Sequence, residues 1–412
     1  MELSEIDLNN FELFVHGDPH AAWKVLREQA PVHWNPMGDS GYWSITTYDD
    51  ALTVYRDPRT FSSQRGGIAL NYGLTDEETM AQQAGFGQML IVTDPPRHTR
   101  MRQIINKRFT RAALAPQEPH IRAIATEILD AVAARGQCDF VIDVAARLPT
   151  AVICEMMGIP RADWDMMFTV ANMSIGTHDP EYQVNGDAYA TGRQAQLNCF
   201  NYFVNTISER RKNPGSDLVS ALVHGEIEGE KLTDLEILFN CFLLIIGGQE
   251  TTRNATSGGM LALIDNPDAR ARLMRDRALL PTAIEEILRY TSPVTHMMRT
   301  ATRAVEMRGQ RIEEGDRVVI WNASANRDPA QFPDPDRFDI ARTPNEHLAF
   351  GHGEHFCLGA NLARLELMVM FDEVLKRMPD LELDGQVQRL YSNFVAGIKH
   401  MPVRFTPTRA AA

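Results

Sequence analysis

The chain has 412 residues, of which 44% are hydrophobic and 23% charged, an ordinary composition for a globular protein with a sizeable core. Its formal net charge of −13 argues against nucleic acid or an anionic membrane as a partner. Five widely spaced cysteines argue against a disulfide framework, and with no signal-peptide pattern and no apolar stretch long enough for a bilayer they predict a cytoplasmic protein.

The first sixty residues predict helices beside a small β region. Residues 21–29 and 48–55 have helical spacing. Two short runs of strand formers, residues 32–34 and 42–45, are separated by residues 35–38 and indicate a hairpin. Residues 62–93 follow with many glycines and no steady periodicity, and a loop of that length is usually functional.

A basic helix is predicted next, after Asp94-Pro95-Pro96. It places His98 and Arg102 one turn apart on the same face. Several other basic residues stand nearby, namely Arg97, Arg100, Lys107, Arg108 and Arg111. Taken alone, this pattern indicates a solvated basic face.

Residues 118–210 predict mainly helices, because isoleucine, leucine and valine recur there at helical spacing. Within this region a methionine-rich run, residues 166–175, is followed by the polar sequence Gly176-Thr177-His178-Asp179-Pro180. Methionine stripes are more often core than binding surface, and a mixed role is open at this point.

A long helix is predicted from the capping box formed by Thr233 and Glu236 to residue 265. Its length of roughly 48 Å is enough to cross a whole domain. Gly247 and Gly248 stand in its middle, where each glycine costs about 1 kcal/mol relative to alanine. Either a flat group presses on the helix there, or another helix packs closely against it.

Two further charged positions follow. Glu286 and Arg289 are three residues apart on a predicted helix, which places their charges side by side. This signal is weak alone, because surface pairs of this kind contribute little to stability. Residues 294–299 then lead into a predicted strand that carries Arg299.

The most informative stretch is residues 350–359, where Cys357 stands in a loop with Gly351, Gly353 and Gly359, before a helix predicted at 360–378. The glycines allow left-handed backbone conformations or close passage of a flat, bulky group. The start of the helix favours the thiolate form of the cysteine. A thiolate held in this way suits a soft metal such as haem iron.

Two alternatives to a haem site are weighed against it. The first is a buried structural cysteine, which is the commonest role of a lone cysteine. The second is a zinc site built from His352, His355 and Cys357, although the spacing of a four-ligand zinc site is missing.

The pattern Phe-Gly-x-Gly-x-His-x-Cys-x-Gly at residues 350–359 resembles the signature of the cytochrome P450 haem-thiolate monooxygenases. Further stretches resemble the family's motifs in the same order, so the resemblance covers nearly the whole chain. It implies one domain, residues 1–412, that is mainly α with a small β region in the family's triangular-prism fold. It also implies haem b as cofactor.

The resemblance assigns roles residue by residue. Cys357 matches the axial thiolate ligand of the haem iron, and Glu250 and Thr251 match the acid and alcohol that deliver protons to the oxygen being activated. The residues expected to bind or border the haem are His98, Arg102 and Arg299 at its propionates, and His355, Phe350, Gly351 and Gly247 around it. Glu286, Arg289 and Arg337 match a structural triad of the family.

The resemblance also implies a reaction, in which one oxygen atom from O2 is inserted into a small molecule. No flavin or iron–sulfur motif is present, so electrons are expected from a separate ferredoxin and reductase with NAD(P)H. Arg100 and the remaining basic residues are candidates for docking that acidic partner, and we expect a monomer.

The expected substrate is lipophilic, because the segments that border the family's pocket are apolar. The residues expected to line it are Ile68, Leu74, Met89, Ile91, Leu244, Val294, Met297 and Val395. A sterol, terpenoid or alkyl chain is favoured, and tailoring of a polyketide or peptide is the alternative. A peroxide-driven peroxygenase would usually lack the Glu250–Thr251 pair, and a non-catalytic haem-binding sensor would not need it.

Overall fold

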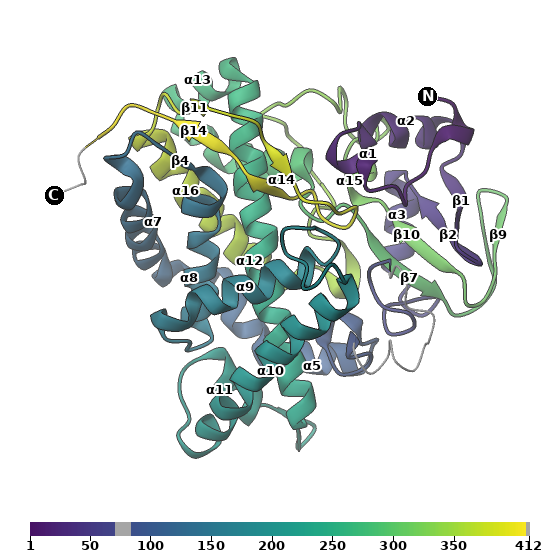
Figure 1. Cartoon of the computed structure of the whole chain (residues 1–412). Coiled ribbons are helices and arrows are strands. Elements are labelled where there is room, and N and C mark those ends of the chain that lie inside the picture. Colours follow the sequence, from purple (N-terminus) through teal and green to yellow (C-terminus); the bar gives the residue numbers. More distant parts are fainter. Residues whose placement is uncertain (71–83, 409–412) are drawn as a thin grey trace.

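The computed structural model describes residues 1–70 and 84–408 of the chain (Figure 1). Long helices fill one half of the molecule, and strands with short helices form the other half. The helices of the larger half are α5 (Arg97–Asn106), α6 (Arg111–Leu114), α7 (Glu118–Ala133), α8 (Arg147–Met156), α9 (Trp164–Ile175), α10 (Ala188–Lys212), α11 (Leu218–His224), α12 (Asp234–Asp265), α13 (Pro267–Arg275), α14 (Leu280–Thr291) and α16 (Ala360–Arg377).

The smaller half is built on a five-stranded sheet with the order β1-β2-β10-β7-β3. Strand β10 runs parallel to β2, and the other pairs are antiparallel. The strands are β1 (Val32–Met37), β2 (Ser40–Ile45), β3 (Phe61–Ser62), β7 (Met297–Ala301) and β10 (Arg317–Ile320). The helices of this half are α1 (Glu12–Val15), α2 (Pro19–Gln29), α3 (Tyr48–Arg56) and α15 (Asn322–Ala325).

The remaining strands form small sheets, of which the three-stranded one joins distant parts of the chain. A three-stranded sheet has the order β11-β14-β4 and pairs β14, near the C-terminus, with β4 from the first half of the sequence. Its strands are β4 (Gln137–Asp139), β11 (Glu382–Leu383) and β14 (Pro402–Arg404). The two-stranded sheets are β5 (Glu226–Ile227) with β6 (Glu230–Lys231), β8 (Val305–Met307) with β9 (Gln310–Ile312), and β12 (Gln388–Arg389) with β13 (Ile398–His400).

The predicted hairpin is present, but its strands are longer than expected. The sequence pattern places residues 35–38 in the connection, whereas Pro36 pairs with Gly41 and Met37 with Ser40. The turn is therefore confined to Gly38, which has φ +60°, and the residue after it. Strand β1 lies at the edge of the sheet, where the missing N–H of a proline breaks no ladder hydrogen bond.

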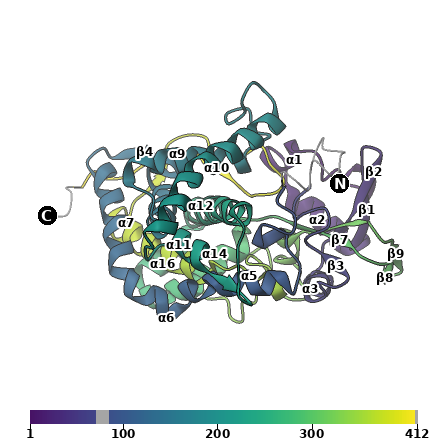
Figure 2. The same cartoon turned by 90° about the horizontal axis from the view of Figure 1, so that it is seen from below.

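Helix α12 lies in the middle of the helical half (Figure 2). The predicted capping box is confirmed, with Thr233 and Glu236 exchanging side-chain and backbone hydrogen bonds, and the helix ends at Asp265 as predicted. It contacts α8, α9, α10, α14 and α16. Because neighbours surround it, most of its residues are buried, as expected of a helix that is apolar around much of its circumference.

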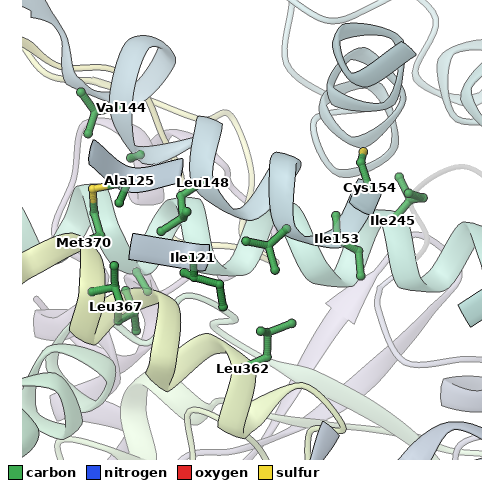
Figure 3. Close-up of a cluster of buried hydrophobic side chains, with 14 of the residues drawn as sticks. Ile121, Ala125, Val144, Leu148, Ile153, Cys154, Ile245, Leu362, Leu367 and Met370 are labelled. Atoms are coloured by element: carbon green, nitrogen blue, oxygen red, sulfur yellow. The ribbon is translucent and has the colours of Figure 1, made fainter. Parts of the chain in front are cut away.

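A continuous hydrophobic core joins α12 to its neighbours (Figure 3). Side chains from α7, α8, α12 and α16 meet there, among them Ile121, Leu148, Ile245 and Leu367. Cys154 is fully buried in this core, and burial raises the pKa of its thiol to about 12, as expected of a structural cysteine. Within the described residues, none of the helices has the length and hydropathy needed to cross a membrane.

Candidate active site

The loop before α16 presents Cys357 to an internal cavity. The Cys357 amide donates to the carbonyl oxygen of Phe350 at 2.9 Å, which closes the loop. Gly351 and Gly353 have φ of +66° and +70°, so the predicted left-handed conformations are confirmed at both. A side chain at Gly353 would also meet the Tyr55 carbonyl oxygen at 2.5 Å. Gly359 has φ −83° and does not need that conformation; it lies at the N-terminus of α16 beside the Cys357 sulfur.

The pKa of the Cys357 thiol is set by opposing effects, of which burial is the largest. Burial raises the pKa of the thiol, which favours the neutral form. The Gly359 amide, which donates to the sulfur, and the positive charges of Arg102 and Arg364 act in the opposite direction. A bound metal cation would turn this balance toward the thiolate, because the thiolate is the form that coordinates.

The cavity beside Cys357 lies between α12, the loop before α16 and the loop before β7. Thr251 of α12 and Cys357 both line it. Every residue predicted to bind or border the haem lines it too: His98, Arg102, Arg299, His355, Phe350, Gly351 and Gly247. The structure thus brings together side chains that lie far apart in the sequence.

Four side chains that can carry positive charge meet at one end of the cavity. His98 and Arg299 are buried, with 1% and 4% of their surface exposed. The His98 and His355 rings lie with centroids 4.1 Å apart. Burial lowers the pKa of His98 to about 4 and that of His355 to about 2, and the charges of Arg102 and Arg299 reinforce both shifts. No ion pair in the described part of the chain involves these four residues.

The same four residues provide a test of whether a dianionic haem fits. Both ring nitrogens of His98 and Nε2 of His355 are buried and have no hydrogen-bond partner. Buried polar groups and cations without partners are costly, so such a cluster needs anionic acceptors. The two propionates of a haem would supply them, and the residues present therefore fit that group.

The two glycines in the middle of α12 have different explanations. A side chain at Gly247 would meet nothing within 4 Å, because Gly247 is exposed to the cavity. A side chain at Gly248 would meet Cγ1 of Ile153 in α8 at 2.9 Å. Both interpretations left open by the sequence therefore apply, one to each residue: space for a flat group at Gly247 and close helix packing at Gly248.

Thr251 and Glu250 are adjacent in sequence but lie in different surroundings. Thr251 lines the cavity, and its hydroxyl donates to the Gly247 carbonyl oxygen at 2.9 Å. Glu250 is 1% exposed, is not among the cavity-lining residues and forms an ion pair with Arg253. Burial raises the pKa of Glu250, and Arg253 opposes the shift.

The predicted structural triad needs one correction. Glu286 binds Arg289 as expected, with oxygen–nitrogen distances of 2.8 Å, but its third partner is Arg342 at 3.1 Å. Arg337 is exposed and contributes only its carbonyl oxygen, which accepts from Arg289 and Arg342. Both residues lie in the irregular segment between α15 and the Cys357 loop, and its path brings the side chain five positions farther along to the buried carboxylate.

The neighbouring Glu285 belongs to a different ion pair, with Arg364 of α16 at 2.7 Å. Hydrogen bonds from Arg364 and His347 outweigh the effect of burial and lower the pKa of Glu285 to about 2. This pair ties α14 to the helix that follows the Cys357 loop.

Most of the predicted pocket residues line the cavity: Ile68, Ile91, Leu244, Val294 and Met297. Met89 does not, because it packs with Val92 and Phe239 in a separate apolar cluster. Val395 lies behind the wall, where it forms a β-bridge with Val294. Leu74 lies outside the described residues.

Some cavity residues were not identified from the sequence. Tyr55 donates its hydroxyl to Asn322 Oδ1 at 2.7 Å, and its ring lies 5.6 Å from the Arg299 guanidinium. Glu366 of α16 also lines the cavity, is 2% exposed, and burial raises its pKa well above the usual value. Glu366 is recognisable in the sequence as a carboxylate on the same helix face as the apolar Leu362 and Met370, a position where burial is expected.

The zinc alternative has no support from side-chain geometry. The described residues contain no group of three or more His, Cys, Asp or Glu side chains placed to hold a metal ion. The His355 ring lies against that of His98. A metal held through a single protein thiolate within a larger flat ligand is compatible with this arrangement.

Comparisons with known proteins agree with this geometry. Residues 153–394 match the family model described as Cytochrome P450. The methyl-branched lipid omega-hydroxylase of Mycobacterium tuberculosis is 39% identical over 98% of this chain and 95% of its own length. The steroid C26-monooxygenase of the same organism is 39% identical over 99% and 98%. A Mycobacterium marinum cytochrome P450 in complex with pseudoionone superposes with a TM-score of 0.89, at 34% identity and 96% coverage of both chains.

Proposed function

The chain belongs to the cytochrome P450 family of haem monooxygenases, and on this basis we propose that it hydroxylates the end of a branched alkyl chain. Such a chain occurs in methyl-branched lipids and in the side chain of sterols. The observation that carries the proposal is the shared cavity, in which Cys357 and Thr251 lie beside walls of aliphatic side chains.

Haem b, the cofactor of this family, would supply the chemistry that activates O2 and transfers one oxygen atom to a C–H bond. In this chain Cys357 would hold the haem iron, and His98, Arg102 and Arg299 would bind the propionates. Gly247, which has open space beside it, would allow the flat face of the cofactor to approach α12. The apolar walls would exclude water from the cavity.

Thr251 and Glu250 would supply the protons that the reaction consumes. The Thr251 hydroxyl lies at the cavity surface, where it can pass a proton into the cavity. Glu250 is the nearest carboxyl in sequence, and its raised pKa is the property expected of a proton donor near neutral pH. Its ion pair with Arg253 holds it away from the cavity, so a change of rotamer or a bridging water would have to connect it to Thr251.

The substrate class is proposed from the cavity walls and from the named relatives. Ile68, Leu90, Ile91, Leu243, Leu244, Val294 and Met297 form an aliphatic surface. Asn240 also lines the cavity, but its side-chain oxygen accepts from the Leu90 backbone amide and its side-chain nitrogen donates to the Gln88 carbonyl oxygen. The relatives' names describe oxidation of a methyl-branched lipid at its omega position and of a steroid at C26. In both reactions the oxidised carbon lies at the end of an alkyl chain, and such a chain would fit against the aliphatic wall of this cavity.

Electrons are proposed to come from a separate ferredoxin with its reductase. Phe356, next to Cys357, is 41% exposed and offers a short route from the surface to the thiolate. Several basic residues nearby are already occupied: Arg100 pairs with Glu228 at 2.9 Å, and Arg97 pairs with Glu236. Lys107 and Arg111 are exposed and form no ion pair in the described part of the chain, so they are the stronger docking candidates.

The proposal is tested with the haem-loaded protein and three lipophilic probes: isostearic acid, cholestenone and geraniol. Titrations followed by haem absorbance report binding, and turnover with a surrogate ferredoxin, reductase and NADPH is compared with hydrogen peroxide alone. We expect isostearic acid or cholestenone to bind best and to yield a terminal alcohol in the NADPH system. Products that form only with peroxide, or preferential oxidation of geraniol, would contradict the proposal.

A second arm of the experiment tests the ligand assignment. Cys357→Ser should abolish the thiolate-type absorbance of the reduced carbon monoxide complex, because a serine oxygen is a harder and weaker donor to iron. A variant that keeps that absorbance would show that Cys357 is not the ligand.

A further inference from the structure

The side of α12 that faces away from the cavity carries a second polar site. Glu250 and Arg253 are each 1% exposed and form an ion pair one turn apart. Arg253 Nη1 donates to Asn172 Oδ1 of α9 at 2.5 Å. The pair is therefore enclosed between α12 and α9, and solvent does not reach it directly.

This enclosed site is incompletely hydrogen-bonded. Glu250 Oε1, Arg253 Nε and the Tyr182 hydroxyl are buried without a partner, and so are both amide atoms of Asn254, one turn after Glu250. Tyr182 belongs to the segment between α9 and α10. Its ring and the Asn172 carbonyl oxygen both lie against Gly176, and the Asn172 side chain is the one that accepts from Arg253. Burial has the largest effect on the pKa of the Tyr182 hydroxyl and raises it, and the charges of Arg253 and Glu250 act on it as well. Buried polar atoms without protein partners are normally satisfied by ordered water.

On its other side, Tyr182 lies close to an ion-pair network that reaches the surface. The charges of Glu181 and Asp179 also act on its hydroxyl. Lys399 of β13 binds Asp179 at 2.9 Å and Glu181 at 3.1 Å, and His400 Nε2 lies 3.0 Å from Glu181. The Glu181 side chain is 36% exposed and can exchange protons with solvent.

We propose that Tyr182 is a positioning residue that holds ordered water between Glu181 and Glu250, and that protons enter the active site along this route. Each proton taken up at the Glu181–His400 end displaces one through the water to Glu250, and from there to the Thr251 hydroxyl. The tyrosine and the water are unchanged after each transfer. This inference rests on the proposed role of Glu250 and names the entry point of its protons.

If Tyr182 had only a structural role, removal of its hydroxyl would leave coupling unchanged, because the ring alone provides the packing. The ring packs against Gly176, where no side chain could be accommodated. The hydroxyl makes no hydrogen bond within the described part of the chain, so packing does not require it. Tyr182→Phe keeps the ring and removes only the group that would hold water.

The matched control is Tyr202→Phe. Tyr202 lies on α10 and donates its hydroxyl to Asp163 Oδ2 at 2.9 Å, in a contact that does not involve α12. The haem-loaded wild type, both tyrosine variants and Glu250→Gln are crystallised and assayed with isostearic acid, or with cholestenone if it binds better. The measured quantities are ordered water at Tyr182 and Glu250, product formed per NADPH consumed, and the solvent deuterium isotope effect on product formation.

We expect water bridging Tyr182 and Glu250 in the wild type and Tyr202→Phe, and displaced water in Tyr182→Phe. Product per NADPH should fall roughly tenfold in Tyr182→Phe, with a larger solvent isotope effect, and stay within about twofold in Tyr202→Phe. Wild-type coupling in Tyr182→Phe, or no water at this site in the wild type, overturns the inference. If Glu250→Gln is uncoupled in that case, the role of Glu250 survives; if it also behaves as wild type, that role fails with it.

Discussion

Two buried clusters of charged side chains, similar in size, differ in how completely their atoms are paired. In the first, both Glu286 oxygens accept from Arg289 and Arg342, and one also accepts from the Asp339 amide. In the second, which we call the cation cluster, His98, Arg102, Arg299 and His355 meet without any ion-pair partner in the described residues. The first cluster is complete as a protein structure. The second lacks acidic partners within the described residues, which is the arrangement expected of a site for an anionic ligand.

The comparison shows how a buried charge can be assigned to structure or to function. A carboxylate whose lone pairs are filled by protein donors has no capacity left for a ligand, whereas cations without an ion-pair partner can still bind an anion. The same reasoning applies along α12, where Glu250 has one paired and one unpaired oxygen. Unpaired buried atoms therefore mark both the proposed haem site and the proposed water site.

The largest expected effect is on the complete cluster. Glu286→Gln leaves Arg289 and Arg342 with reduced countercharge at a fully buried position, and we expect the free energy of unfolding to fall by about 3–5 kcal/mol. Urea denaturation of the haem-free protein measures it. Arg337→Ala is the control, because its side chain is exposed, and it should change stability by less than about 0.5 kcal/mol. An equal loss in both variants would restore Arg337 to the triad.

The next largest expected effect is on haem retention, with little change in the stability of the fold. Arg102→Ala and Arg299→Ala should weaken haem retention by roughly 10- to 100-fold at every salt concentration, because a charged hydrogen bond to a buried propionate contributes about 1.5–3 kcal/mol. The stability of the haem-free protein should fall much less than in Glu286→Gln. Haem transfer to apomyoglobin measures retention. Unchanged transfer rates in both variants would contradict the proposed propionate contacts.

Thr251→Ala is expected to act on coupling rather than on binding. The Thr251 hydroxyl lies at the cavity surface and bonds only to the Gly247 carbonyl, so its loss should leave haem and probe binding within about twofold. NADPH consumption should shift toward peroxide release, with product per NADPH reduced roughly tenfold. Thr252→Ala is the matched comparison, because Thr252 follows on the same helix and also lines the cavity, and it should keep wild-type coupling. Wild-type coupling in Thr251→Ala would reduce this residue to a packing role.

The smallest effect concerns the surface. Arg100 shares an exposed ion pair with Glu228, so Arg100→Ala should slow reduction by ferredoxin by no more than about twofold, and only at low ionic strength. Lys107→Ala should slow it more, because Lys107 is exposed and has no ion-pair partner in the described residues. Both variants should keep their haem, unlike Arg102→Ala. Loss of haem from Arg100→Ala would mean that the two faces of α5 are assigned the wrong way round.

Local signals predicted the helices well. The capping box at Thr233 and the Asn-Pro sequence after residue 265 fixed both ends of α12, because both depend on neighbouring residues only. The site residues His98, Arg102, Arg299 and Cys357 were identified through a resemblance to known motifs and lie together in the structure. Their individual roles stay predictions, as does the organisation of residues 1–412 as one domain.

The misassigned residues depend on how irregular segments fold. Arg337 and Arg342 stand in the same coil, and only its path decides which of them reaches Glu286. Met89 precedes two residues that line the cavity, and without periodicity the sequence does not indicate which side chain points inward. The partnerless atoms around Tyr182 could not be predicted, because they depend on side-chain packing between α9, α12 and the connection after α9.

The pairing of β14 with β4 has a consequence for synthesis on the ribosome. The sheet joins residues 402–404 to residues 137–139, and the cavity draws on side chains from Tyr55 to Leu367. At about 5–20 residues per second, Cys357 is translated roughly 10 to 50 s after His98. His98 and Arg102 are therefore made long before the sulfur that would bind iron, whereas His355 of the same cluster is made only two residues before it. A haem captured during translation, before residue 299 is made, would therefore meet only two of the four residues of the cation cluster.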